Sequence, residues 1–292
     1  MAPPTLWLRC LAKKGDMREA PSVSQPCRPT LPSRWKASSR SRDCPMSLDW
    51  LTARPIAHRG LHDAQRGIIE NTATAFAAAI SGNYGIETDL QISADGEAIV
   101  HHDDALGRLT EGAGRLAEMS AVQLQSIRFK ATADRILTLG ELLDLVAGRA
   151  TLLLELKSHF NGDTRLVTRA ADVLSAYRGP AALMSFDPEL IELVRSRYPA
   201  LVRGIVAQRH YSRSEWKELP ASARRNMGLL LHVPRSRPQF IAYSVRDLPA
   251  GPPLLMHALW KLPLLTWTVR SDKDRKRAAR WADQVIFEDW RP

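Results

Sequence analysis

Eight short apolar runs alternate with segments of helical periodicity from residue 51 onward, and this alternation limits the possible folds more than any other feature of the sequence. The apolar runs lie at 55–57, 85–91, 151–156, 181–185, 203–206, 240–243, 264–269 and 284–287. Helical segments occur between most of them, at 71–81, 139–147, 164–176, 188–197, 214–225 and 272–282. Eight strands with intervening helices over roughly 240 residues predict one (β/α)8 TIM barrel, although an open doubly wound sheet has the same local pattern.

The first 45 residues have no such pattern. They contain nine Lys and Arg against three Asp and Glu, which places +6 of the net charge of +10 in this segment. All three cysteines and seven of the 19 prolines are also here, so we expect residues 1–45 to be a disordered basic extension. Its Arg- and Ser-rich composition also fits a transit peptide, and a third account makes Met46 the true start of the chain. The barrel domain is then 46–292.

The longest apolar stretch, 252–269, is interrupted by His257 and Lys261 and is shorter than the roughly 20 apolar residues that cross a bilayer. We therefore expect no transmembrane segment. The apolar run near the N-terminus is too short for a secretory signal, which makes the cytoplasm the default location. The net positive charge makes nucleic-acid binding a distant alternative, but most of that charge lies outside the barrel domain.

Ionisable residues collect at the C-terminal ends of three predicted strands, where a TIM barrel builds its site. His58 and Arg59 follow the first run, and Glu87 and Asp89 lie two residues apart on the same face of the second. Two carboxylates on one face repel each other unless a cation lies between them. Glu155 and Lys157 end a third, leucine-rich run. Three charged strand ends together favour one shared metal site over a single buried ion pair.

A β-hairpin is predicted directly after Asp89. Asp95-Gly96 is a strong signal for a two-residue hairpin loop, and the chain resumes as an apolar run that ends at His101, His102 and Asp103. With that loop Asp89 pairs with His102, which brings a histidine back to the carboxylates, and His101 faces the other way in a structural role. A one-residue bulge would exchange the two histidines.

With these residues in place, the sequence resembles the glycerophosphodiester phosphodiesterase family, whose fold is a (β/α)8 barrel. The resemblance covers about 54–292. The matching residues are His58-Arg59-Gly60, Glu70-Asn71-Thr72 with Ala75 and Phe76, Glu87-Thr88-Asp89, His102-Asp103 with Leu106, Arg108 and Thr110, Thr138-Leu139 with Glu141, Glu155-Leu156-Lys157, Ser185-Phe186, Trp267-Thr268-Val269 and Asp289.

This resemblance implies roles for particular residues. Glu87, Asp89 and Glu155 would hold a divalent cation, Ca²⁺ or Mg²⁺, and His58 and His102 would be the catalytic acid and base. Arg59 and Lys157 would contact the phosphate of a small glycerophosphodiester, and Trp267 would line the pocket near the alcohol. Asn71 matches a position at the site entrance, and it is equally well explained as the N-cap of the helix that follows.

The resemblance also implies the reaction, in which a glycerophosphodiester is hydrolysed to glycerol 3-phosphate and an alcohol. Either water or the glycerol 2-hydroxyl, through a cyclic phosphate, could be the nucleophile. The chain departs from the family pattern at Ile69, Leu137 and Arg270, and its closing motif is Phe287-Glu288-Asp289-Trp290. None of these departures removes a proposed ligand or histidine. They affect the rim of the site and the alcohol that it accepts.

Residues 104–138 form an insertion that is too long for a simple loop, and we expect a short helix at 120–127 and a lid over the site. The nearest alternative function is a lysophospholipase D or a cyclising phospholipase of the same barrel superfamily. Such an enzyme needs an exposed apolar rim, for which Trp260, Leu262, Leu264 and Leu265 are candidates, although this stretch is equally well explained as a barrel strand with its preceding helix. The oligomeric state is not predicted.

Overall fold

The computed structural model describes residues 47–212 and 216–292, and the predicted basic extension therefore lies outside the described residues. The strands are β1 (Ile56–His58), β2 (Gly85–Ile92), β3 (Ala98–Val100), β4 (Leu137–Thr138), β5 (Leu152–Leu156), β6 (Ala181–Ser185), β7 (Val202–Ala207), β8 (Phe240–Ser244), β9 (Leu264–Val269) and β10 (Gln284–Phe287).

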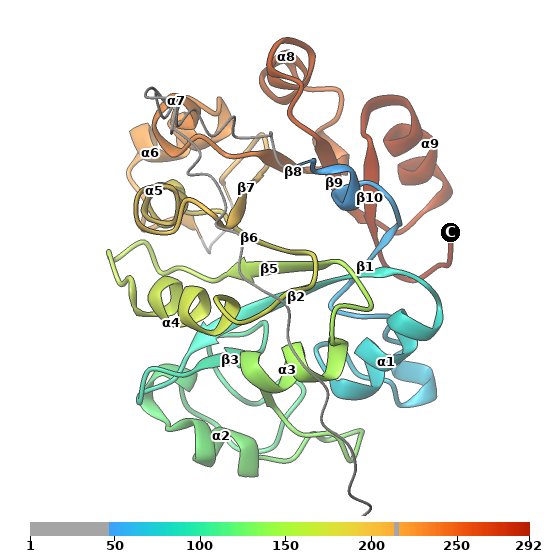
Figure 1. The fold of residues 1–292 in the computed structure, drawn as a ribbon, viewed down its shortest axis with the longest axis vertical. Coiled ribbons are helices and arrows are strands. Elements are labelled where there is room, and N and C mark those ends of the chain that lie inside the picture. The colour runs from blue at the N-terminus through green and yellow to red at the C-terminus, as the bar shows by residue number, and fades with distance from the viewer. Residues whose placement is uncertain (1–46, 213–215) are drawn as a thin grey trace, which may run out of the picture. The chain divides into compact units, whose positions relative to one another are not determined.

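Eight of these strands form a closed parallel barrel. The order is β1, β10, β9, β8, β7, β6, β5 and β2, and β1 pairs with β2 to close the ring. All eight predicted strands are therefore confirmed, and closure excludes the open doubly wound sheet. β3 pairs antiparallel with β2, and β4 pairs antiparallel with β3, so the hairpin extends the sheet beyond the barrel. Figure 1 shows the helices in a ring around the strands.

The helices are α1 (Ala73–Ser81), α2 (Ala121–Ser126), α3 (Leu139–Val146), α4 (Arg165–Leu174), α5 (Pro188–Arg197), α6 (Ala221–Gly228), α7 (Val233–Ser236), α8 (Gly251–Trp260) and α9 (Asp272–Trp281). The helix predicted at 214–225 starts outside the described residues, and among residues 216–292 its counterpart α6 begins at Ala221 after the N-cap Pro220. No helix among the described residues is long and apolar enough to cross a membrane.

Alternating side chains of the strands fill the barrel. Leu153, Val206 and Leu265 belong to one buried cluster in the interior, where the ring of Phe240 also lies. Gly204 is required beside that ring, since a Cβ atom there would lie 2.2 Å from Phe240. The larger cluster on the outside of β2 and β5 packs against α1, α3 and α4. This packing fixes the strands whose carboxyl ends carry the predicted site.

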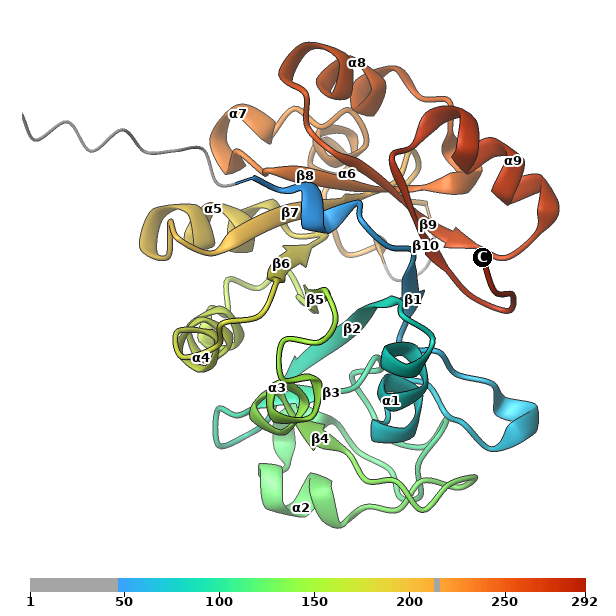
Figure 2. The same ribbon diagram turned by 45° about the vertical axis from the view of Figure 1, so that its right-hand side comes forward.

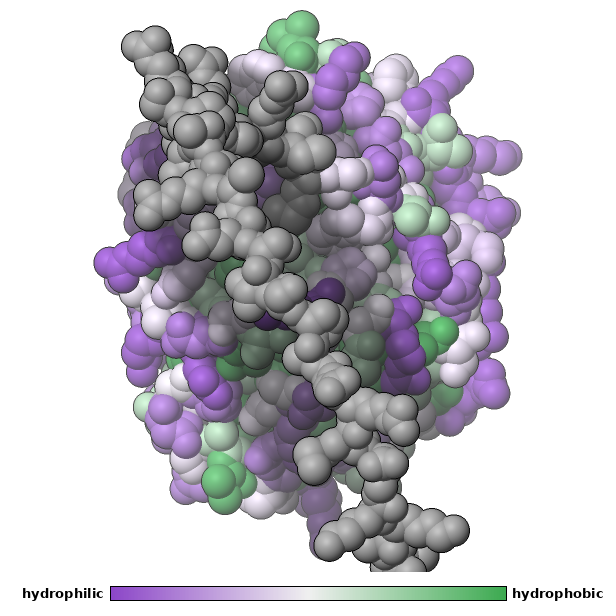
Figure 3. Space-filling model, in the orientation of Figure 1, coloured by the Kyte–Doolittle hydropathy of each residue, from purple (hydrophilic) through white to green (hydrophobic). Residues whose placement is uncertain are grey.

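The insertion predicted at 104–138 has a small core of its own beside the hairpin. Leu106, Leu124 and Phe129 pack with Ile99 of β3, and a capping box on Ser120 begins α2 at the predicted place. Figure 2 shows α2, β3 and β4 together on one side of the barrel, next to α3. Figure 3 shows the molecule in the orientation of Figure 1, with mostly hydrophilic side chains on the visible face. An apolar group lies at the top, where Figure 1 draws α8.

Candidate active site

Three carboxylates meet inside the barrel at the C-terminal ends of β2 and β5. Asp89 and Glu155 are register partners on these adjacent parallel strands, and Glu87 lies one inward-facing position before Asp89. All three are buried, and ligand oxygens of the three lie within 4.8 Å of one another. The alternation of β2 that suggested a shared face therefore does bring the predicted metal ligands together.

Two cations lie against this cluster. The ammonium of Lys157 is 2.7 Å from Oδ1 of Asp89 and 2.7 Å from Oε1 of Glu155. The Nε atom of Arg59 is 3.3 Å from Asp89, and its Nη1 atom donates to Glu70 at 2.8 Å. Arg59 has a positive φ of 56°, and this turn lets its backbone N–H donate to Oε2 of Glu87 at 3.1 Å. Arg59 thus contacts three acids, one through its backbone and two through its side chain.

The pKa values of Glu87 and Asp89 are shifted in opposite directions. Burial and the nearby carboxylates of Asp89 and Glu155 raise the pKa of Glu87 well above its ordinary value. Burial would also raise the pKa of Asp89, yet Lys157 and Arg59 hold it well below its ordinary value. In return, Asp89 and Glu155 raise the pKa of Lys157 against the effect of burial, so that it stays charged. The cluster therefore has excess negative potential around Glu87 that a cation would relieve.

Asn71 belongs to this site rather than to the helix cap. Thr72 is the N-cap of α1, and its hydroxyl accepts from the backbone of Ala75. The buried amide of Asn71 donates to Oδ2 of Asp89 at 2.9 Å and accepts from the hydroxyl of Thr88 at 2.7 Å. The N-cap interpretation of Asn71 is therefore wrong by one residue. Its positive φ of 57° turns the chain so that the amide reaches the carboxylate.

His58 is held by a residue that the sequence did not single out. Its Nδ1 atom lies 2.6 Å from Oε2 of Glu288, and its Nε2 atom lies 3.8 Å from Oε2 of Glu87. Although burial opposes it, His58 and Arg270 lower the pKa of Glu288 to about 2. Because this ionised carboxylate can only accept, Nδ1 of His58 must donate. The Nε2 atom is left free toward the carboxylates.

His102 has the same type of partner. Its Nδ1 atom lies 2.7 Å from Oδ1 of Asp103, whose pKa is lowered by His102 and Arg108 against the effect of burial. Arg108 donates to Asp103 at 2.6 Å and to Glu70 at 2.6 Å. Since Glu70 also binds Arg59, a chain of charges joins the two sides of the site. Both histidines therefore donate from Nδ1 to a carboxylate.

The register predicted for the hairpin is wrong. Leu90 pairs with Val100, and the backbone N–H of His101, not of His102, donates to the carbonyl of Asp89 at 3.1 Å. The loop has three residues, 94–96, because Gly96 at φ 81° ends a three-residue turn and Ser93 bonds to Glu97. His101 is buried with its Nδ1 on the carbonyl of Asp103, as expected of a structural histidine. His102 lies beyond the end of β3, where strand alternation no longer sets its direction.

Trp267, the residue expected near the alcohol, lies on β9. Its indole N–H donates to the carbonyl of Ala242 at 2.9 Å, and its ring meets Phe186 edge to face at 5.5 Å. Phe186 in turn contacts Tyr211 and Trp216. An aromatic wall therefore runs from β9 toward the ends of β6 and β7. Leu264 and Leu265, two candidates for an exposed rim, are buried within β9, and that part of the prediction is wrong.

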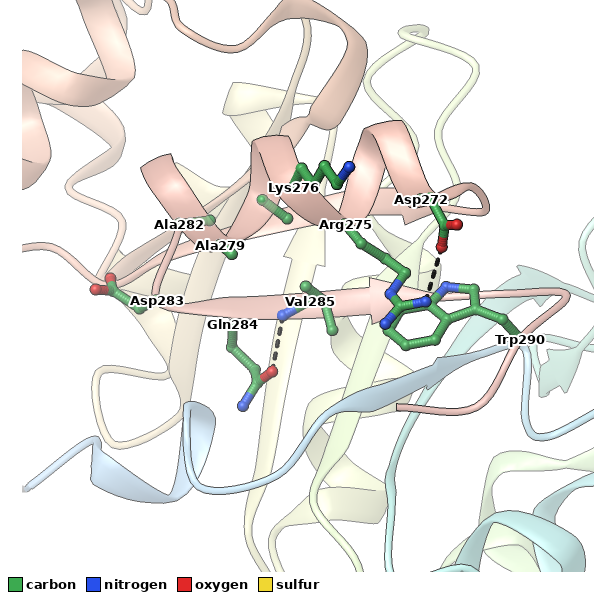
Figure 4. Close-up of a pocket in the computed structure, with 10 residues that line it drawn as sticks. Asp272, Arg275, Lys276, Ala279, Ala282, Asp283, Gln284, Val285 and Trp290 are labelled. Carbon is green, nitrogen blue, oxygen red and sulfur yellow. Dashed lines mark hydrogen bonds and ion pairs between the residues drawn. The ribbon is translucent and has the colours of Figure 1, made fainter.

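A cavity of about 640 Å³ lies elsewhere, along α9 and β10. Figure 4 shows Arg275 lying over the ring of Trp290, with a distance of 4.5 Å to the ring centroid, beside the small side chains of Ala279 and Ala282. None of the predicted site residues lines this cavity.

The residues present suit a divalent cation. Carboxylate oxygens are the ligands that Ca²⁺ and Mg²⁺ prefer, and the cluster offers three of them from two adjacent strands. Burial, and then the neighbouring carboxylates of Asp89 and Glu155, raise the pKa of Glu87, as expected of a buried acid that a cation would stabilise. The donor set contains no thiol or thioether that would favour a softer metal.

The site places the cations Arg59 and Lys157 against three buried acids, with the imidazole of His58 beside them, and these groups suit the hydrolysis of a phosphoric diester. The fold and the site together define a phosphodiesterase. A model of the glycerophosphoryl diester phosphodiesterase family matches residues 58–289, so the chain belongs to that family.

Individual relatives agree with this assignment. The chain is 27% identical over 252 residues to the glycerophosphodiester phosphodiesterase of Caldanaerobacter subterraneus, covering 80% of this chain and 93% of that protein. It is 29% identical to glycerophosphodiester phosphodiesterase 1 of Bos taurus over 52% of this chain, and it spans about half (48%) of that relative's length. A phosphodiesterase of Oleispira antarctica, solved with the product sn-glycerol-3-phosphate, has the same fold with a TM-score of 0.65, 19% identity and coverage of 81% and 94%.

Proposed function

We propose that the protein is a metal-dependent hydrolase that cleaves small glycerophosphodiesters to glycerol 3-phosphate and an alcohol. The observation that carries this proposal is the buried group of Glu87, Asp89 and Glu155 with Lys157 and Arg59 against it. The names of the relatives and the product bound by the Oleispira antarctica protein support the substrate class.

Glu87, Asp89 and Glu155 are the proposed ligands of Mg²⁺ or Ca²⁺. A divalent cation at these oxygens supplies Lewis acidity toward a non-bridging phosphate oxygen. Arg59 and Lys157 provide further positive charge for the diester. Lys157 uses two of its three donors on Asp89 and Glu155, and the planar fork of Arg59 keeps donors beyond those that bind Glu70 and Asp89.

His58 and His102 are the proposed acid and base. Each has Nδ1 engaged by a carboxylate, which leaves Nε2 as the atom that exchanges a proton. Burial lowers the pKa of His58 against the opposing effect of Glu288, which favours the neutral imidazole. One imidazole removes a proton from the nucleophile and the other donates a proton to the leaving alkoxide. Water and the glycerol 2-hydroxyl are both compatible nucleophiles.

The aromatic wall around Trp267 is the proposed contact of the alcohol group. Edge-to-face rings offer apolar area and also π-faces that attract a quaternary ammonium. Glycerophosphocholine therefore suits this wall better than a strongly anionic diester. The insertion with α2 is the proposed lid, because Arg108, which it carries, joins Glu70 and Asp103 at the edge of the site.

The test is release of glycerol 3-phosphate from glycerophosphocholine and glycerophosphoethanolamine by the full chain, with chelator and then with excess Mg²⁺ or Ca²⁺. We expect release that chelator stops and metal restores. Absence of release with every divalent cation would contradict the proposal. Lysophosphatidylcholine in the same assay tests the lysophospholipase D alternative, which would be favoured by faster cleavage of the micellar substrate.

A further inference from the structure

Exposed apolar side chains gather on one side of the molecule. Among residues 47–212 and 216–292, six large apolar side chains are exposed, and five of them lie between residues 229 and 260. These five are Leu229, Leu231, Leu255, Leu259 and Trp260. The sixth, Val122, is on α2. The apolar group at the top of Figure 3 lies where Figure 1 draws α8.

The helix α8 is apolar on both its inner and outer sides. Leu254 and Met256 pack on the cluster outside β8 and hold the helix on the barrel. Leu255 and Leu259, 58% and 66% exposed, are four residues apart and share the outer face, and Trp260 ends the helix. No acidic residue occurs in α8, and Lys261 follows it directly. If this outer face contacted only water, its exposed apolar side chains would contribute no stability to the helix.

A cationic cavity adjoins the start of α8. It has a volume of about 370 Å³, and Arg209, His210, Arg224 and Arg225 line it together with the first residues of the helix. No acid lines it, and none of these arginines forms an ion pair within the described part of the chain. The nearest acid in contact is Asp247, whose carboxylate accepts from the backbone N–H of Arg209 at 2.9 Å.

A second observation within this cavity indicates an anionic ligand. Tyr243 lines the cavity, its side chain is fully buried, and its hydroxyl has no hydrogen-bond partner in the structure. The Nε atom of Arg224 also has no partner. A buried hydroxyl without a partner carries a cost that an acceptor in the cavity would remove. Arginine forks and a phenol together suit the oxygens of a phosphate group.

We propose that α8 and this cavity form a docking surface for an anionic phospholipid bilayer. Leu255, Leu259 and Trp260 enter the interface between head groups and acyl chains, where tryptophan is favoured and an amphipathic helix lies flat. The arginines bind lipid phosphates and follow the negative potential of the surface. A symmetric contact between two copies fits less well, because it would bring the same unpaired cations together in one interface.

The test is flotation of the full chain with vesicles of phosphatidylcholine alone and of equal parts phosphatidylcholine and phosphatidylglycerol. We expect binding to the anionic vesicles and little to the neutral ones. The pair Leu255→Gln with Leu259→Gln, and the pair Arg224→Gln with Arg225→Gln, should each weaken binding by roughly tenfold or more. Val122→Gln is the matched control for an exposed apolar side chain, and Lys276→Gln with Arg280→Gln is the control for lost charge. Both controls should bind as the unchanged protein does.

Three results would overturn the proposal. Binding that persists in both paired variants would place the lipid contact elsewhere, including in residues 1–45. Equal binding to neutral vesicles, or no binding to either kind, would contradict docking of this surface on an anionic bilayer. A dimer that light scattering shows to dissociate in the Leu255→Gln, Leu259→Gln variant would make this face a contact between copies. Turnover of a soluble diester and the thermal unfolding curve show that each variant is folded, and neither depends on vesicles.

Discussion

The Nδ1 atom of His58 lies 2.6 Å from the carboxylate of Glu288, 230 residues later in the chain. Glu288 follows β10 and His58 ends β1, and these two strands are neighbours in the closed barrel. Arg270 donates to the same carboxylate oxygen at 2.7 Å. Arg270 and Glu288 are both departures from the family pattern, and Glu288 contacts His58, a proposed catalytic residue. This contact fixes which nitrogen of His58 faces the carboxylates.

Replacement of Glu288 should therefore act through His58. In Glu288→Ala the imidazole loses the acceptor that fixes its tautomer, and we expect kcat to fall by about tenfold to a hundredfold with little change in KM. Asp289→Asn is the matched control, because that side chain is 62% exposed and has no contact with His58. Its kcat should stay near that of the unchanged enzyme. Equal losses in both variants would contradict the assignment. The ¹⁵N shifts of the His58 ring report the tautomer without turnover.

The corresponding partner of His102 gives a second prediction. Asp103→Asn should lower kcat in a similar way, because the amide cannot stabilise a positive imidazole as the carboxylate does. Arg108→Gln should have a smaller effect, since Arg108 acts through Asp103 and Glu70 and is 45% exposed. Steady-state kinetics with glycerophosphocholine separates the two. A larger loss in Arg108→Gln than in Asp103→Asn would show that the arginine itself contacts substrate.

Asn71 and its neighbour Thr72 can be separated experimentally. Asn71→Ala removes one of the donors to the buried Asp89 and the acceptor of the Thr88 hydroxyl, which should cost about 1–3 kcal/mol of unfolding free energy and weaken metal binding. Thr72→Ala removes the helix cap and the hydrogen bond from the Thr72 hydroxyl to the carbonyl of Ile69, and it should cost about 1 kcal/mol with metal affinity unchanged. Urea unfolding and calorimetric titration with Mg²⁺ measure the two quantities. Unchanged Mg²⁺ affinity in Asn71→Ala would make Asn71 purely structural.

Removal of a ligand oxygen tests the metal site directly. Glu155→Gln should lower the affinity for Mg²⁺ or Ca²⁺ by at least about tenfold, because one of three charged ligands becomes a neutral amide. Asp163→Asn, on the loop before α4, is the control and should bind metal normally. The measurement is calorimetric titration of chelator-treated protein. Identical affinities for the two variants would exclude Glu155 as a ligand.

Stability at low pH should depend on Glu288. Its pKa is lowered to about 2 in the folded protein, against an ordinary value of 4.5, so the group stabilises the fold fully above its unfolded pKa. That contribution is lost as the pH falls from about 5 toward 2. The unfolding free energy of the unchanged protein should therefore fall more steeply over this range than that of Glu288→Gln. Parallel curves from urea unfolding would contradict the lowered pKa.

The eight strands and the shared face of Glu87 and Asp89 could be predicted from the sequence because both depend on local alternation, whereas the choice of a closed barrel over an open sheet came from the family resemblance. Glu87 and Asp89 share a face at any register of β2, and a leucine-rich strand brings Glu155 to the same end of the barrel. The partners of the histidines could not be predicted in this way. Glu288 meets His58 only because the barrel closes, and closure joins the first and last strands without any local signal.

The error in the hairpin has a similar physical origin. Asp95-Gly96 fits a two-residue loop and also a three-residue loop with glycine in the left-handed region, and the difference shifts every pairing by one residue. The contacts of Ser93 with Asp95 and Glu97 select the longer loop. For Asn71 and Thr72, both residue types are good N-caps, and only the position of Asp89 in space shows which one serves the site.

The most direct test of the account is ³¹P NMR of glycerophosphocholine incubated with the enzyme and Mg²⁺, beside a His58→Ala, His102→Ala double variant. We predict that the diester signal is replaced by that of glycerol 3-phosphate while choline is released, and that the double variant leaves the diester intact. Phosphocholine as the product would place the cleavage on the wrong side of phosphorus. Turnover by the double variant would contradict the proposed roles of the two histidines.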